Sequence, residues 1–161
     1  RQVKPIIKII TIIFGIFIMA PGFALADICS ESYIDLRWSG GSAKFSVELA
    51  DNEAERAQGL MFRETLGRFT GMIFVYPNEQ SVNFWMRNTL IPLDILFFNS
   101  KGLLKKIHQN ARPLDLSSLF GGDAIQYVLE INGGMVAKLG IKEGTEMRYP
   151  MVDNKHAVWK C

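Results

Sequence analysis

Short stretches of this chain alternate apolar and polar residues, and two others are apolar throughout. Residues 44–50 alternate with a period of two, which is typical of a strand with one buried face. Residues 71–76 and 93–98 are continuous apolar runs, so we expect strands that are buried on both faces. Less regular apolar patterns predict further strands at residues 82–89, 103–107, 124–131 and 145–151.

Two short helices interrupt this pattern. Asn52 followed by Glu55 has the spacing of a capping box, which predicts a helix over residues 53–61. A second helix is expected over residues 133–140, with Gly140 as its C-cap. Short strands with two short helices predict a mainly-β fold, either a small single-domain sandwich or a barrel-like sheet.

The first 26 residues have the pattern of an export signal. Basic residues precede an uncharged stretch, Pro21-Gly22 then breaks the helix, and Ala24-Leu25-Ala26 is a small-x-small cleavage site. We therefore expect a signal peptide over residues 1–26 and a periplasmic or secreted mature protein. The alternative is an uncleaved anchor in the inner membrane, because residues 9–26 carry no charge.

Cleavage would leave a mature chain of 135 residues, an ordinary length for one domain. Removing three basic residues from the formal net charge of +2 leaves −1, which argues against nucleic-acid binding. We expect a monomer that meets a membrane only through the signal segment before cleavage. The predicted parts of the mature chain are a lead at 27–43, a β domain at 44–151 and a tail at 152–161.

Both cysteines lie in the predicted mature chain, Cys29 near its start and Cys161 at its end. In an oxidising compartment this placement predicts one disulfide that joins the two termini. The alternatives are two unrelated thiols or a thiol that pairs with another chain. The sequence contains no Cys-x-x-Cys motif, which argues against a redox enzyme.

The run from Phe84 to Asp94 sets several polar side chains in an apolar frame. Buried polar groups need hydrogen-bond partners, so these side chains are expected to have a role. If residues 82–89 are extended, Trp85 and Arg87 share a face on which an indole and a guanidinium suit a sugar, an aromatic or an anionic group. The alternative is a half-buried tryptophan that is covered by the arginine stem.

Two carboxylates fall in or beside predicted buried strands. Asp94 requires backbone N–H donors or a cation there, which favours a structural role at the nearby turn or in an ion pair. Glu130 lies on the opposite face of its predicted strand from Leu129 and could be a second carboxylate in the same cleft. Two carboxylates in one cleft would supply the groups for hydrolytic acid–base catalysis.

Arginines and methionines offer two weaker site hypotheses. Arg56 and Arg63 lie along and after the first helix and could bind an anion, although a solvated, salt-bridged helix face is the competing interpretation. Met61, Met72 and Met86 carry thioethers suited to Cu(I), but methionine is also ordinary core filler. We treat copper as a minor alternative and predict no metal site and no cofactor.

Four blocks of this sequence resemble the domain-of-unknown-function family DUF192. The resemblance implies a small β-rich single domain, often exported in bacteria, with no established activity and no catalytic residues to carry over. The chain departs from the family pattern at Arg87, where we expect Lys, at Gly134, where Ala is common, and at Thr145, where Asp is common. The matching blocks are residues 53–63, 71–75, 84–94 and 127–134.

We therefore expect a cleft near Trp85 that binds a small molecule or a segment of a partner protein. The alternatives are a hydrolase that acts on an envelope component through Asp94 or Glu130, and an interaction protein whose polar run only maintains the fold. The sequence leaves open whether the protein is an enzyme. The residues expected to line or support the cleft are Arg63, Trp85, Arg87, Asn88, Asp94 and Glu130.

Overall fold

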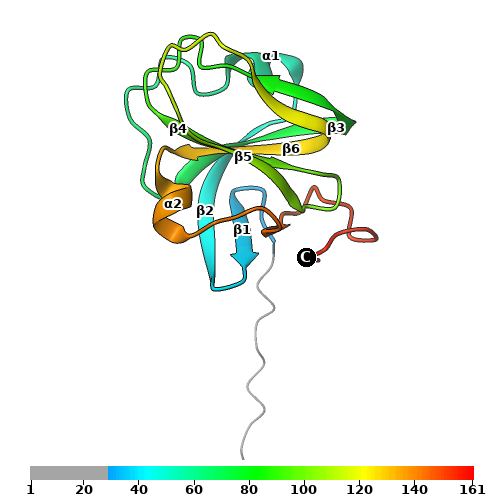
Figure 1. The fold of residues 1–161 in the computed structure, drawn as a ribbon. Coiled ribbons are helices and arrows are strands. Elements are labelled where there is room, and N and C mark those ends of the chain that lie inside the picture. The colour runs from blue at the N-terminus through cyan, green and yellow to red at the C-terminus, as the bar shows by residue number, and fades with distance from the viewer. Residues whose placement is uncertain (1–28) are drawn as a thin grey trace, which may run out of the picture.

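The computed structural model describes residues 29–161, and Figure 1 shows their fold. The predicted signal segment lies outside the described residues. Seven strands and two short helices follow one another along the chain. They are β1 (Tyr33–Trp38), β2 (Gly41–Ala50), α1 (Glu53–Gln58), β3 (Thr70–Phe84), β4 (Leu93–Phe98), β5 (Leu104–Ala111), β6 (Leu119–Asn132), α2 (Met135–Leu139) and β7 (Glu146–Arg148).

All seven strands belong to one curled sheet with the order β5-β4-β6-β3-β2-β1-β7. Neighbouring strands are antiparallel except β2 and β3, which are parallel and are connected through α1. The sheet curls far enough for its two edges to meet. The Met147 N–H donates to the Gly102 carbonyl at 2.8 Å, and the Leu104 N–H donates to the Thr145 carbonyl at 2.8 Å. The mainly-β prediction is confirmed, and the barrel-like alternative describes the sheet.

The sheet separates two apolar cores, because successive residues of a strand point to opposite faces. One core lies inside the curl and packs against α2; it contains Leu129 of β6 together with Val136 of α2. The other core lies on the opposite face and contains Phe74 of β3 and Val128 of β6. Leu60, which follows α1, is buried in this second core. The second core is the one that borders the candidate site.

The strand β3 is longer than predicted. We predicted one strand that ends before Pro77 and another over residues 82–89, whereas β3 continues through Pro77 and ends at Phe84. Register shifts between Val75 and Gln80 interrupt its pairing with β6, which accommodates a proline that cannot donate a ladder hydrogen bond. The residues after Phe84 therefore form a loop.

A second difference concerns the predicted N-terminal lead. It contains the strand β1, in which Ile34 and Leu36 are fully buried. Two alternating apolar positions in a polar segment are too short a pattern to predict a strand. The first helix ends earlier than predicted, at Gln58, because Gly59 takes φ 50° and ψ −138°. The N-cap is present, since Asn52 Oδ1 accepts the Glu55 N–H at 3.0 Å, while the Glu55 carboxylate accepts the N–H of Asp51 rather than that of Asn52, at 3.3 Å.

Cys29 and Cys161 form a disulfide across a sequence separation of 132 residues, as predicted. In the chain-entropy model, closing so long a loop stabilises the fold by about 4–5 kcal/mol. A disulfide between the two ends indicates an oxidising compartment. Among the described residues, no helix is long and apolar enough to cross a membrane.

Candidate functional site

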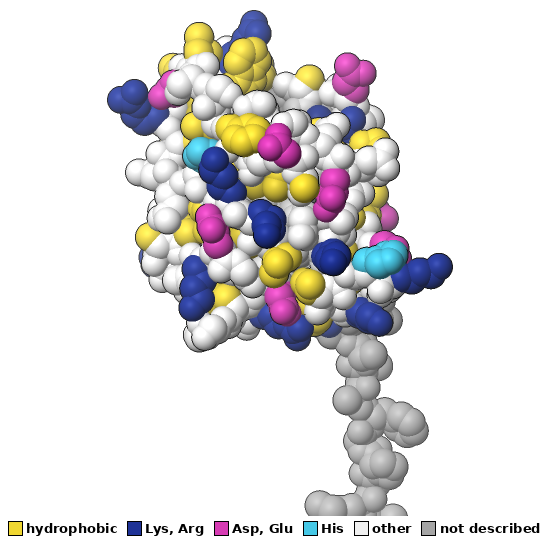
Figure 2. All heavy atoms as spheres, turned by 45° about the vertical axis from the view of Figure 1, so that its right-hand side comes forward, with side chains coloured by type: hydrophobic (Ala, Val, Ile, Leu, Met, Phe, Trp, Pro, Cys, Tyr) yellow, Lys and Arg dark blue, Asp and Glu magenta, His cyan; other side chains and the backbone are white. Residues whose placement is uncertain are grey.

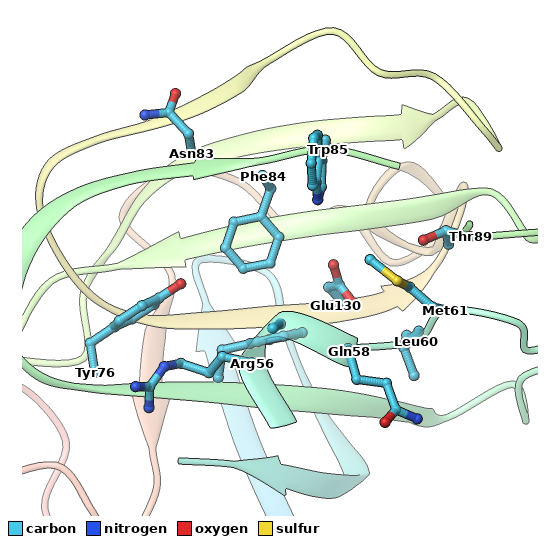
Figure 3. A pocket seen from close by; sticks show the side chains of 13 residues that line it. Arg56, Gln58, Leu60, Met61, Tyr76, Asn83, Phe84, Trp85, Thr89 and Glu130 are labelled. Atoms are coloured by element: carbon cyan, nitrogen blue, oxygen red, sulfur yellow. The ribbon is translucent and has the colours of Figure 1, made fainter. Parts of the chain in front are cut away.

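A cavity of about 190 Å³ lies between α1 and the last part of β3. Figure 3 shows how its walls are built. Tyr76 and Phe84 of β3, followed by Trp85, form aromatic walls, while Met61 closes the side next to α1. Glu130 of β6 points into the space between these walls. The cavity therefore combines aromatic walls and several polar side chains with one inward-facing carboxyl group.

Gly59 makes room for this cavity at the end of α1. Its backbone angles lie in a region that is nearly restricted to glycine. A Cβ atom at this position would lie 3.2 Å from the Phe74 ring and 4.0 Å from Glu130 Oε2. The glycine thus allows the chain to turn away from α1 close to the sheet without filling the space beside Glu130.

Glu130 has an apolar environment for a carboxyl group. Only 5% of its surface is exposed, and its Oε2 atom has no hydrogen-bond partner among the described residues. In the sheet it lies between Met72 of β3 and Ile95 of β4. Burial raises the pKa of Glu130 to about 8, because the charged form loses its hydration. At pH 7 the group is therefore mostly protonated.

Asp94 lies on the other face of the sheet. It pairs in register with Ile131, while Glu130 pairs with Ile95, so the two carboxyl groups point in opposite directions. Asp94 is fully buried and accepts three backbone N–H groups, from Asn110 at 2.7 Å, Gly134 at 3.0 Å and Val136 at 2.7 Å. These bonds fix the start of α2 against β4 and β5. Asp94 and Glu130 do not share a cleft, which corrects the expected juxtaposition of the two groups.

Trp85 lies at the mouth of the cavity, with 48% of its surface exposed. The Arg87 guanidinium carbon lies 5.3 Å from the centre of the indole ring, so the two residues are neighbours although both belong to a loop. Arg87 is exposed and does not line the cavity. Phe84, next to Trp85, is held by edge-to-face contacts with Phe74 at 5.1 Å and Phe97 at 5.7 Å.

The remaining predicted site residues support the neighbourhood of the cavity without lining it. Asn88 adopts a positive φ of 54° and donates from Nδ2 to Met61 Sδ at 3.8 Å. Its carbonyl accepts the Phe62 N–H at 2.8 Å, so it connects two loops beside the cavity. Arg63 forms two hydrogen bonds with Glu48, at 2.7 and 2.5 Å. These bonds raise the pKa of Arg63 and direct its charge away from the cavity.

The arginine that does line the cavity is Arg56. Its Nη1 donates to the Val75 carbonyl at 2.9 Å and to the Asp51 carbonyl, and its guanidinium carbon lies 5.1 Å from the Tyr76 ring centre. In Figure 3 the guanidinium points away from Glu130. Arg56 therefore carries its charge at the outer side of Tyr76.

Gly59, Tyr76 and Phe84 were absent from the predicted cleft. Gly59 and Phe84 lie within the sequence blocks used for the family resemblance, but apolar and glycine residues there are equally typical of a core. Of the three methionines considered for copper, Met61 lines the cavity, whereas Met72 and Met86 are buried in the second core. Among the described residues, no group of three or more His, Cys, Asp or Glu side chains could hold a metal ion.

These observations define a small β domain with one curled sheet, a disulfide between Cys29 and Cys161, and a single carboxyl group among the described residues that line an aromatic-walled cavity. The chain belongs to the family DUF192, "Uncharacterized ACR", whose model matches residues 36–149. This confirms the resemblance found in the sequence. Comparison with curated proteins gave no match.

Two solved structures have the same fold. A protein of unknown function from Novosphingobium aromaticivorans is 43% identical, with a TM-score of 0.70, and the match covers 71% of this chain and 82% of that one. A protein from Sinorhizobium meliloti, described as a putative transcription regulator, is 36% identical with a TM-score of 0.70. That match covers 74% of this chain and 93% of the other.

The surface provides a further observation on partners. On the face presented in Figure 2, Lys and Arg side chains are interspersed with Asp and Glu side chains. A nucleic-acid-binding face typically gathers basic residues into a patch or stripe. The distribution on this face is therefore that of an ordinary solvated surface.

Proposed function

We propose that this protein is a binding domain that holds a small molecule in the cavity between α1 and β3. Glu130 is the polar anchor at the inner end of the cavity, and Phe84 and Trp85 are its apolar wall and its mouth. The observation that carries the proposal is the Glu130 carboxyl group, which is buried, points into the cavity and has an oxygen, Oε2, without a hydrogen-bond partner among the described residues. Leaving a buried polar group unsatisfied costs about 1–3 kcal/mol, which a ligand with a matching group would recover.

The size of the cavity favours a small molecule over a partner segment. Its volume of about 190 Å³ is similar to that of a cavity of about 150 Å³ that binds benzene. A folded segment of a protein would not fit, although one inserted side chain would. The exposed edge of Trp85 provides the entrance. We also propose a periplasmic or secreted location, which the disulfide supports.

Two other functions have weaker support. Hydrolysis by a pair of carboxylates lacks its geometry, because Asp94 and Glu130 point to opposite faces of the sheet. Regulation of transcription, suggested by the description of the Sinorhizobium protein, conflicts with the absence of a basic excess in residues 27–161.

A fragment screen by two-dimensional NMR tests the proposal. Bound fragments are expected to shift the amide signals of Gly59, Met61, Phe84 and Glu130 in the wild-type protein. Trp85→Ala should weaken these fragments by at least tenfold while unfolding stability changes by less than about 1 kcal/mol, because the side chain is half exposed.

The matched control is Trp159→Ala. Trp159 packs against Arg37 and Arg148, away from the residues that line the cavity, so its loss should leave fragment binding unchanged. The proposal is wrong if no fragment shifts the cavity amides, or if Trp85→Ala binds the same fragments with wild-type affinity.

A further inference from the structure

We infer that the ligand of this cavity is an organic ammonium ion, whose N–H groups contact the Glu130 carboxylate while its carbon chain packs on Phe84 and Trp85. This inference rests on the proposed binding function and names the chemical class of the ligand. It is drawn from three features of the cavity: the carboxyl group, the placement of the nearby cation and the aromatic walls.

The first feature is that the charged form of Glu130 offers only hydrogen-bond acceptors and, in the part of the chain that the structure describes, has no cationic or N–H partner that would favour it. Its Oε2 atom has no hydrogen-bond partner among the described residues, and only 5% of the surface of Glu130 is exposed. A ligand that brings N–H donors satisfies this oxygen directly. A carboxylate ligand would instead place a second negative charge or a second acceptor against it.

The second feature is that no cationic side chain among the described residues that line the cavity pairs with Glu130. Among the described residues that line the cavity, the titratable side chains are Arg56, Tyr76 and Glu130. Arg56 donates to the Val75 and Asp51 carbonyls and points away from Glu130. A cation beside the carboxylate must therefore come from the ligand.

The third feature is the aromatic character of the walls. Tyr76, Phe84 and Trp85 surround the space into which Glu130 points. Aromatic faces attract cations through the negative potential of their π systems, and they equally cover the methylene groups next to an ammonium. A strongly hydrated anion gains nothing from these surfaces. The combination of one carboxyl group with aromatic walls selects an ammonium ion over neutral or anionic molecules of the same shape.

Binding of an ammonium ion has a proton signature. Burial raises the pKa of Glu130 to about 8, so the free protein holds a proton there at pH 7. An ammonium neighbour favours the carboxylate and displaces that proton. Burial also raises the pKa of Tyr76, so it stays protonated. Close to one proton is therefore released on binding. At pH values below the pKa of Glu130, the affinity for the ammonium ion increases by up to about tenfold for each unit by which the pH rises.

A neutral ligand that only accepts a hydrogen bond would do the opposite. It would bind the protonated carboxyl group, retain the proton and lose affinity as the pH rises. The two ligand classes are therefore distinguished by the number of protons released as well as by affinity. This distinction is measurable on the wild-type protein alone.

The test is isothermal titration calorimetry at pH 6 to 8 with three probes of similar shape: 2-phenylethylammonium, 2-phenylethanol and 3-phenylpropanoate. Measurements in two buffers of different ionisation enthalpy give the number of protons released. The ammonium probe is expected to bind at least tenfold more tightly than the alcohol and to release close to one proton at pH 7. The carboxylate probe is expected to bind most weakly.

Glu130→Gln should abolish the preference for the ammonium probe and its proton release, with the melting transition retained. Glu143→Gln, an exposed glutamate, is the control and should retain both. Tighter binding of the alcohol or the carboxylate, or ammonium binding without proton release, would overturn the inference while leaving a binding cavity. If no probe binds and the NMR screen also finds no ligand, the proposed function fails as well.

Discussion

Asp94 and Glu130 are carboxyl side chains on adjacent strands of one sheet, and both are buried, yet their surroundings differ in kind. Asp94 accepts three backbone N–H groups inside the curl of the sheet. Glu130, on the other face, has an oxygen with no protein partner beside a cavity. A carboxylate with all its donors from the backbone maintains the fold, whereas one without donors is available to a ligand. The comparison separates a carboxylate that stabilises the fold from the carboxyl group that we propose as the ligand anchor.

The largest effect is expected from removing the structural carboxylate. Asp94→Ala should lower the free energy of unfolding by about 3–6 kcal/mol. The buried Val136 N–H left without an acceptor costs about 1–3 kcal/mol, and the partly buried N–H groups of Asn110 and Gly134 cost amounts near the lower end of that range. Urea unfolding measures the change. Asp123→Ala, which removes an exposed carboxylate bonded to Ser81, should change stability by less than about 1 kcal/mol. Similar small changes in both variants would refute the structural role of Asp94.

Replacing Glu130 should raise the free energy of unfolding near neutral pH, whereas replacing Asp94 should lower it. The folded-state pKa of Glu130 is raised from 4.5 to about 8. Between these values the folded state holds a proton that the unfolded state has lost, so wild-type stability falls as pH rises. The slope from this group is about 1.4 kcal/mol per pH unit. The contribution is fully present below pH 4.5 and is lost as the pH rises to about 8.

Glu130→Gln should therefore remove this slope and make the protein more stable than the wild type at pH 8. Chemical unfolding at pH 5, 6, 7 and 8 gives the comparison, and Glu143→Gln should behave as the wild type. If Glu130→Gln were destabilising at pH 8, the carboxylate would have stabilising partners in the folded protein. Glu130 would then resemble Asp94.

A smaller effect on stability is expected from replacing Gly59, which determines the shape of the cavity. Gly59→Ala should cost about 1–3 kcal/mol, because the backbone conformation there is nearly restricted to glycine. Gly140→Ala is a suitable control, since Gly140 also has a positive φ, of 75°, but lies at the end of α2. Both variants should lose stability, and only Gly59→Ala should weaken binding of a cavity ligand. If both variants bound a cavity ligand equally well, Gly59 would not contribute to the site.

Much of the fold follows from local patterns in the sequence. The two continuous apolar runs became central strands, and the capping box and Gly140 marked a helix start and a helix end. The failures have physical causes. The strand β1 offers only two buried alternating positions, and β3 passes through Pro77 because a bulged, irregular pairing tolerates it. Such irregularities depend on the partner strand, which is distant in the sequence.

The site was less predictable than the fold. Trp85 and Glu130 were both expected near a cleft, and the structure brings them to one cavity. Asp94 was grouped with them, but a register that pairs it with Ile131 places it on the other face. The position of Arg63 was decided by Glu48, a long-range ion-pair partner. Residue types can thus indicate which groups need partners, while the register of the sheet decides which of them meet.

The most direct test of the account is the titration of the Glu130 carboxyl carbon by ¹³C NMR in the ligand-free protein, with Glu130→Gln to assign the signal. A single titration with a midpoint of about 8 is expected, far above the ordinary glutamate pKa of 4.5. A midpoint near 4.5 would show that the carboxylate is solvated or paired in the folded protein. It would contradict the claim that Glu130 is buried without a partner and is available to bind a ligand.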